Sequence, residues 1–212
     1  AGDDISVPHR TSKMVDAWLS AEARPSIVYS NEMLIDEDGE YISGKNTVKI
    51  TDTALAIKHT LSGGTNFVIG GAACGYAREI HFGVGPLLAD VIAEDFIYSF
   101  RSLLNGGSIG ISEPLIMYRK NTESIMGQFK KNKIPRKRWL MGRLAKLVEY
   151  KRAIDKYGGV GQYFNWLLER DIKTTKQQVK AQGNGWGGRI YFIIWILATV
   201  RIKYILNRIG IL

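Results

Sequence analysis

The sequence contains one cysteine and no glycine-rich loop of the kind that cradles phosphate at the start of a helix. The lone Cys74 excludes an internal disulfide framework and fits a reducing compartment. No charged-then-apolar signal segment follows Ala1, and acids come almost at once, so we expect a fragment or a processed piece of a longer protein. The uncharged run at residues 190–200 has eleven residues, whereas a membrane-spanning helix needs about 20.

The sequence does have enough apolar material for a packed core, because 45% of its residues are hydrophobic, with five Trp, ten Tyr and seven Phe. Charge is unevenly distributed. Residues 1–121 hold ten basic and fifteen acidic residues, a net charge of −5, whereas residues 122–212 hold nineteen and five, a net charge of +14. This contrast predicts two units with different partners. The basic unit would attract anionic lipid, nucleic acid or another polyanion.

Local patterns predict alternating strands and helices up to residue 121 and long helices beyond it. The first expected helix follows Ser6-Val7-Pro8 and ends near residue 24, and a strand over 26–35 comes next, with a turn at 36–39 and a return at 41–42. Further helices are expected over 53–61 and 93–104, and further strands over 66–71, 109–111 and 115–118. The later helices are expected over 139–157 and, after the break at Gly158-Gly159, from Tyr163 onward. The fold class is therefore α/β with a helical, basic C-terminal segment.

Two acidic pairs are candidates for chemistry. Asp3-Asp4 precedes a predicted helix, where paired carboxylates can bind a divalent cation or, more simply, cap the helix. Glu94-Asp95 opens another predicted helix. One of these carboxylates can serve as a general base in a cleft, but acids are also favoured there by the backbone dipole alone. We expect that dipole to keep Asp95 ionised.

Two further segments are less specific. The small residues from Gly70 to Gly75 allow a ligand to approach the backbone closely, but they are equally typical of a tight turn. Arg119 and Lys120, after Tyr118, could hold phosphate or be a solvated pair at a strand end.

The order of these features is more specific than any one of them. The chain runs through DDISVPHR, SIVYSNEMLID, NFVIGGAACGYAREIHFGVGPL, AEDFIYSFRSLLNG and EPLIMYRKN. In this order it resembles bacterial family 2 glycosyltransferases of the GT-A fold, and it is most similar to enzymes of surface-polysaccharide or O-antigen biosynthesis. The resemblance covers about residues 1–121, and AEDFIYSFRSLLNG with EPLIMYR is its most specific part. It implies that residues 1–121 form the C-terminal, acceptor-side half of a GT-A domain.

The resemblance also implies roles for particular residues. Asp95 matches the catalytic base of inverting members, and Glu94 would help to orient the acceptor. Asp3 and Asp4 match the acids that bind a divalent metal, Mn or Mg, which bridges the donor's diphosphate. The family often has a further Asp where this chain has Ala1, so we expect a metal site that is weaker or that rests on Asp3 with Asp4 in support. The segment that lines the donor and acceptor pocket is matched by Gly70, Gly71, Ala72, Ala73 and Cys74, with Arg119 and Lys120 near the diphosphate. The implied reaction transfers a sugar from a nucleotide-sugar donor to a glycan or lipid-linked acceptor.

One departure from the family pattern is large. Family members begin with a nucleotide-binding half, and no counterpart of that half is found in this sequence. We therefore expect residues 1–212 alone to have low or no transferase activity. The alternative interpretation is an inactive fragment or a non-catalytic module of the same fold that binds glycan or membrane.

The basic and aromatic composition of residues 122–212 predicts contact with a membrane surface. The run 190–200 fits either a buried core helix or an interfacial helix, and its neighbours Trp186, Tyr191, Trp195 and Tyr204 favour the interface. The basic cluster over 130–139 fits anionic lipid or a solvated turn. No nucleic-acid-binding module is recognisable, so we expect no nucleic-acid partner. These features predict a cytoplasmic protein, peripheral at the inner face of the cell membrane.

Overall fold

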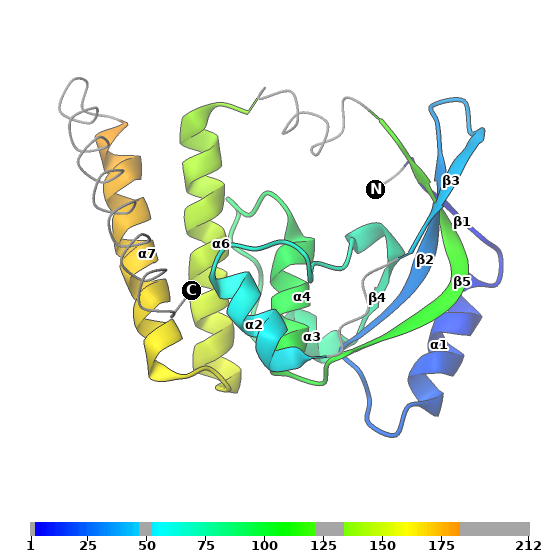
Figure 1. Cartoon of the computed structure of the whole chain (residues 1–212), viewed down its shortest axis with the longest axis horizontal. Helices are drawn as coiled ribbons and strands as arrows, with labels where there is room; N and C mark the ends of the chain where they lie inside the picture. Colours follow the sequence, from blue (N-terminus) through cyan, green and yellow to red (C-terminus); the bar gives the residue numbers. More distant parts are fainter. Residues whose placement is uncertain (1–2, 47–51, 122–133, 183–212) are drawn as a thin grey trace, which may run out of the picture.

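The computed structural model describes residues 3–46, 52–121 and 134–182 of the chain. It is an α/β protein with a mixed five-stranded sheet and helices on both sides of it (Figure 1). The strands are β1 (Ile5–Ser6), β2 (Ile27–Ile35), β3 (Tyr41–Lys45), β4 (Cys74–Tyr76) and β5 (Ser108–Arg119). The helices are α1 (Arg10–Ser20), α2 (Thr53–Leu61), the short 3₁₀ helix η1 (Gly71–Ala73), α3 (Arg78–Phe82), α4 (Glu94–Leu104), α6 (Arg136–Tyr157) and α7 (Gln162–Ala181).

Strand β2 is the centre of the sheet. It pairs in parallel with β5 on one side, and β5 also pairs with the short β1. The other side of β2 is shared by two antiparallel partners, β4 along residues 27–29 and β3 along residues 32–35. One face of the sheet packs on α1 through Met14, Val28 and Leu115. The opposite face packs on α3 and α4, where the buried side chains are Ile27, Tyr29, Ile69, Ile80 and Tyr98.

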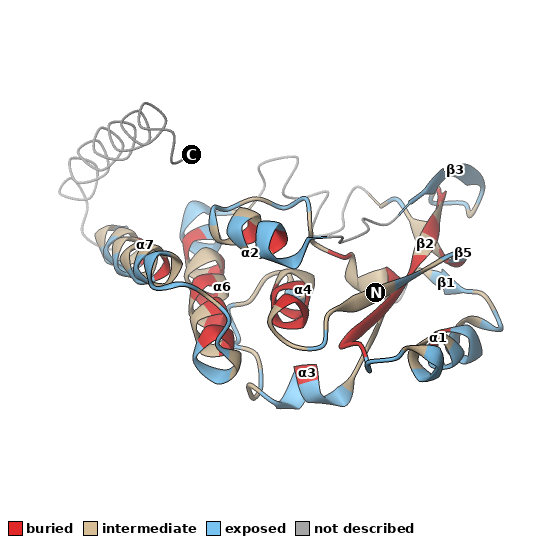
Figure 2. Ribbon diagram, turned by 60° about the horizontal axis from the view of Figure 1, so that its bottom comes forward, coloured by how far each residue is buried: buried red, intermediate tan, exposed pale blue. Residues whose placement is uncertain are grey.

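The helices on that second face continue outward in layers. Helix α4 is the most buried of them, because its residues from Ile97 to Leu103 are all enclosed (Figure 2). Its outer side packs against α6, and α6 packs against α7. A single buried cluster unites α2, α4, α6 and α7, with Phe100, Tyr150 and Leu168 among its members. Residues on both sides of the predicted boundary at 121 and 122 therefore share one core.

Several predicted elements are confirmed. The helix over 53–61 has the predicted bounds and is capped by Asp52, whose side chain accepts a hydrogen bond from the Leu55 N–H. The strand and turn over 26–39, the helix opening at Glu94 and the break at Gly158-Gly159 also occur as expected. The backbone of Gly158 and Gly159 has positive φ, which glycine adopts without steric cost.

Three other predictions were wrong. Ser6 lies in a strand rather than capping a helix, and α1 begins at Arg10 and already ends at Ser20. Residues 66–70 form a turn and irregular backbone rather than a strand, Gly71 begins η1, and the Ile69 N–H donates to Ser99 Oγ on α4 instead of to a neighbouring strand. The two short strands expected around Pro114 are one long strand, β5, which accommodates the proline by a shift in its pairing with β2 near Asn31.

Of the predicted basic cluster over 130–139, residues 130–133 lie outside the described residues, as does the uncharged run at 190–200, and the remainder of the cluster leads into the start of α6 at Arg136. Within the described ranges, no helix is long and apolar enough to span a bilayer.

Candidate active site

The candidate site forms where β2 changes partner along one edge. Tyr29 pairs with Cys74 of β4, and three residues later Glu32 pairs with Lys45 of β3. The loop that leads into β4, residues 70–74, therefore reaches the sheet next to the end of β3. These two segments are separated by about 25 residues in the sequence, so only the shared strand brings them together.

Helix α1 holds the 70–74 loop in place. The guanidinium of Arg10 donates from Nη2 to the carbonyl of Ala72 at 2.6 Å and to that of Cys74 at 3.3 Å. The Cys74 thiol donates back to the Gly70 carbonyl at 3.2 Å, and Ala73 is fully buried. The small residues therefore form a fixed turn whose carbonyls are already bonded.

The backbone of this loop lies directly against the acids that open α4. A methyl group placed on Gly71 would lie 3.5 Å from Glu94 Oε1, 3.5 Å from Tyr76 Oη and 3.7 Å from Asp95 Cβ. Glycine at this position therefore keeps the space beside the two acids clear. The loop and the Glu94-Asp95 pair thus lie side by side, and their roles as pocket and catalytic acids stay predictions.

The environment of Asp95 includes a cause that the sequence did not reveal, namely burial, which opposes the effect of the helix dipole. Burial is the main cause that raises the pKa of this carboxyl group above its ordinary value, and the charge of Glu94 raises it further. The backbone amides of Phe96 and Gly71 act in the opposite direction, and the Phe96 N–H donates to Asp95 Oδ1 at 2.9 Å. Desolvation therefore outweighs the favourable backbone groups and sets the direction of the shift, while the ionised state of Asp95 at neutral pH stays a prediction. Glu94, one residue earlier, is exposed.

The two N-terminal acids, Asp3 and Asp4, differ in their exposure and in their hydrogen bonds. Asp4 Oδ1 accepts a hydrogen bond from the Arg119 backbone N–H at 2.9 Å, while Asp4 Oδ2 is buried with no hydrogen-bond partner in the described residues. Asp3 is exposed, and its backbone carbonyl accepts a bond from Arg119 Nε. Asp4 is therefore the more fixed carboxylate, although we had expected Asp3 to be the principal one.

Tyr118 connects the N-terminal acids with Asp95. Burial is the largest cause that raises the pKa of its hydroxyl, followed by the charges of Asp4, Glu32, Asp3 and Asp95, in that order. All four carboxylates thus act on the same phenol. The four carboxylates come from the segment before β1, from β2 and from α4, and the phenol belongs to β5.

Arg119 has a structural role that was not predicted from the sequence. Its Nη1 donates to the carbonyls of Asp36 at 2.8 Å and Glu37 at 2.6 Å, in addition to the Asp3 contact. The side chain thus joins the β2–β3 turn to the N-terminal segment. Lys120 is exposed, and its backbone N–H continues the sheet by bonding to the Ile35 carbonyl at 2.9 Å. A phosphate role for either residue stays a prediction.

Sequence reasoning missed the Glu32–Lys45 pair. Glu32 is almost fully buried, and its Oε2 lies 2.7 Å from Lys45 Nζ, whose side chain is about half exposed. Lys45 Nζ also lies 5.9 Å from the ring centre of Tyr118. The sequence signal for this pair was Glu32 itself, a charged residue in the middle of the predicted strand 26–35. A buried carboxylate needs a partner, so its position indicated a nearby cation.

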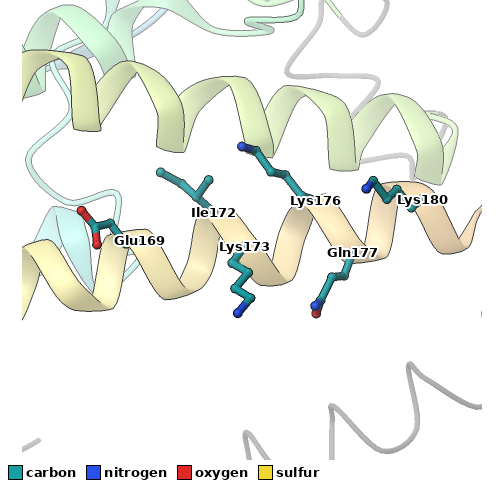
Figure 3. Close-up of a pocket in the computed structure, with 6 residues that line it drawn as sticks. All are labelled: Glu169, Ile172, Lys173, Lys176, Gln177 and Lys180. Carbon is teal, nitrogen blue, oxygen red and sulfur yellow. The ribbon is translucent and has the colours of Figure 1, made fainter.

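Two searches of the described residues bear on ligands. They contain no group of three or more His, Cys, Asp or Glu side chains placed to hold a metal ion. A hollow of about 410 Å³ lies along α7 and is lined by Glu169, Ile172, Lys173, Lys176, Gln177 and Lys180 (Figure 3). None of these six residues belongs to the predicted site.

Comparison with known proteins adds no further constraint: no protein-family model, curated protein or solved structure matches the chain.

Proposed function

We propose that the chain contributes the acceptor side of an inverting glycosyltransferase, which moves a sugar from a nucleoside-diphosphate donor to a glycan or lipid-linked hydroxyl group. The finer fold assignment, the C-terminal half of a GT-A domain of family 2, is part of the same proposal. The observation that carries it is the contact between the loop and the acids: a methyl group on Gly71 would lie 3.5 Å from Glu94 Oε1 and 3.7 Å from Asp95 Cβ, so the segment that the resemblance assigns to the pocket lies against the pair that it assigns to catalysis.

Asp95 is the general base in this reaction. It removes the proton from the acceptor hydroxyl as that oxygen attacks the anomeric carbon of the donor sugar. The bond from that carbon to the diphosphate oxygen breaks, and its electron pair leaves with the diphosphate, so the configuration inverts in one displacement. A base works best when its pKa lies near the operating pH, and burial moves the pKa of Asp95 in that direction. General-base assistance is worth about 10²–10⁴-fold in rate.

The loop beside Asp95 would position the acceptor. Because Gly71 has no side chain, a sugar ring can approach the backbone next to Glu94 and Asp95. Glu94 is exposed and suited to accept hydrogen bonds from neighbouring sugar hydroxyls. Arg10 would keep the loop rigid, which lowers the entropy cost of holding the acceptor in line.

The N-terminal acids fit a divalent cation to a limited extent. Asp4 Oδ2 is a buried carboxylate oxygen without a hydrogen-bond partner in the described residues, which is an unfavourable state that a cation would relieve. Mg²⁺ is commonly held by one or two carboxylates together with substrate phosphates, so Asp4 and Asp3 are sufficient protein ligands. When bound, the metal would neutralise charge on the leaving diphosphate. Arg119 keeps Asp4 in place through its backbone N–H.

The test compares Asp95→Asn with Asp90→Asn, which changes an exposed acid by the same chemistry. Sugar transfer is measured for residues 1–212 alone and for the same chain fused behind the nucleotide-binding half of a family 2 enzyme. We expect transfer by the fusion, a loss of about 10²–10⁴-fold with Asp95→Asn and little change with Asp90→Asn.

Equal transfer by both variants would overturn the role of Asp95. Absence of transfer from every donor and acceptor tried, together with retained glycan binding, would favour a non-catalytic binding module. Full turnover by residues 1–212 alone would contradict the expected need for a nucleotide-binding half.

A further inference from the structure

The outer face of α7 carries aromatic and basic side chains at helical spacing. Residues separated alternately by three and four positions share one side of an α-helix. This spacing aligns six residues over about 25 Å of helix. They are Tyr163, Trp166, Arg170, Lys173, Gln177 and Lys180, hereafter the outer stripe.

The opposite side of α7 is the one that packs against the protein. Leu168 and Thr175 are buried there, and Leu168 belongs to the core shared with α2, α4 and α6. Helix α7 is the outermost element of the described structure (Figures 1 and 2). Five members of the outer stripe are exposed, and the sixth, Arg170, is partly exposed.

The first turns of the stripe are aromatic. Tyr163 is 46% exposed and Trp166 is 56% exposed, and their rings are stacked with centres 6.3 Å apart. The guanidinium of Arg170 lies 5.4 Å from the Trp166 ring centre. Large aromatic side chains that remain in water are typical of surfaces that meet another phase or partner, and Trp and Tyr are enriched at the membrane–water boundary.

The last turns of the stripe are basic. Lys173 and Gln177 point to the side of α7 away from α6, while Lys176 points toward α6 (Figure 3). Together with Lys180, Glu169 and Ile172 they line the hollow described above, so three of its six lining residues are lysines. Two acids lie beside the stripe: Asp171 is 3.1 Å from Arg170 of the stripe, and Glu169 is 3.8 Å from Lys151 of α6, so neither is paired with Lys173 or Lys180.

We propose that the outer stripe of α7 is the surface by which this protein binds an anionic lipid bilayer. The lysines would face lipid phosphate and carboxylate headgroups, and Trp166 and Tyr163 would enter the interfacial layer with α7 parallel to the membrane plane. Bilayers match this combination better than RNA does, because the two aromatic rings of the stripe both lie in its first turns beside basic residues, rather than forming a series along the stripe on which successive bases could stack. This inference is independent of the proposed sugar transfer.

The experiment measures co-sedimentation of the full chain with phosphatidylcholine vesicles, with and without phosphatidylserine, at low and high salt. The test variant is Lys173→Gln/Lys180→Gln. The matched control is Lys58→Gln/Lys156→Gln, which removes the same charge from exposed positions on α2 and α6. Each cation near an anionic surface contributes about fivefold to binding, so we expect about 25-fold weaker binding for the test variant and a much smaller effect of the control. Circular dichroism confirms that both variants fold.

A second measurement tests the aromatic end. Lipids with brominated tails should quench the Trp fluorescence of the wild-type chain when it binds. The quenching should be weaker in the variant Trp166→Phe than in the control variant Trp18→Phe, which removes a tryptophan from α1 instead. The proposal is overturned if the wild-type chain does not bind anionic vesicles at low salt, or if both double variants bind equally well. It is also overturned if a single-stranded RNA binds more tightly than the vesicles and shows the same dependence on Lys173 and Lys180.

Discussion

The guanidinium of Arg101 and the carboxylate of Glu149 lie 2.8 Å apart, and both side chains are fully buried. Arg101 is on α4, seven residues after Glu94 at the start of that helix, and Glu149 is on α6. Arg101 also donates to the carbonyls of Ile80 and His81, and Glu149 accepts from the Leu88 N–H. The pair therefore fixes the helix that carries Asp95 against the basic C-terminal helices.

Removing one member of this pair should destabilise the protein strongly. Arg101→Met leaves the buried Glu149 with Arg152, 2.6 Å away, as its remaining cationic partner, and breaking a buried ion pair costs up to about 3–5 kcal/mol. Chemical denaturation with urea measures the change. The double variant Arg101→Met/Glu149→Leu should recover much of the loss, because no uncompensated charge remains. A double variant no more stable than Arg101→Met would contradict this account.

The raised pKa of Asp95 makes a prediction about stability and pH. Its carboxyl group binds a proton more readily in the folded than in the unfolded state, so its contribution to stability decreases as pH rises from the unfolded to the folded pKa. Above that range the ionised, buried group is a cost. We expect Asp95→Asn to be as stable as the wild-type chain or more stable at neutral pH, with the difference vanishing in acid. Thermal unfolding over a pH series, with Asp90→Asn beside it, checks this.

Gly71→Ala tests the proposed acceptor pocket without strongly affecting the stability of the fold. The added methyl group meets Glu94 and Tyr76 oxygens at 3.5 Å, which is ordinary contact, so stability should change by less than about 0.5 kcal/mol. In an active fusion the methyl group would narrow the space beside Asp95 and raise KM for the acceptor more than it lowers kcat. An unchanged KM would show that the acceptor does not approach Gly71.

Gly70→Ala is the companion variant. Its methyl group would lie 3.3 Å from Oε1 of the buried Glu32, so the carboxylate must shift by a few tenths of an ångström. We expect a destabilisation of about 1 kcal/mol, as is typical of slight overpacking, measured by the same denaturation experiment. A larger effect for Gly71→Ala than for Gly70→Ala would contradict this ranking.

Cys74 should be an unreactive thiol in the folded protein. Burial raises its pKa to about 12, and the charges of Asp95 and Glu32 act in the same direction, while Tyr76 and Arg10 partly oppose it. Because the thiolate is the reactive form, an aromatic disulfide reagent at pH 8 should label the native chain far more slowly than the urea-unfolded chain. The sequence has one cysteine, so the readout is unambiguous. Equal rates in the two states would be inconsistent with a buried thiol.

Prediction from the sequence was most successful where the determinants are local. The helix over 53–61 follows from its capping residue and the glycines after it, and the β2–β3 turn follows from its acidic residues and Gly39. It was least successful where a distant side chain satisfies the backbone. Residues 66–71 have a strand-like composition, yet Ser99 of α4 takes the Ile69 N–H. The candidate site divides in the same way, since Asp95 and the small loop were predicted and Glu32 and Lys45 were not.

The sequence by itself determined the alternation of strands and helices, the two acidic pairs, the lone thiol and the contrast of charge between residues 1–121 and 122–212, because each depends on residue type and near spacing. Only the tertiary structure decided that β2 pairs with β5 in parallel, that Arg101 meets Glu149 across 48 positions, and that Asp95 is buried enough to raise its pKa. The physical reason is that desolvation and long-range pairing depend on which surfaces meet in space.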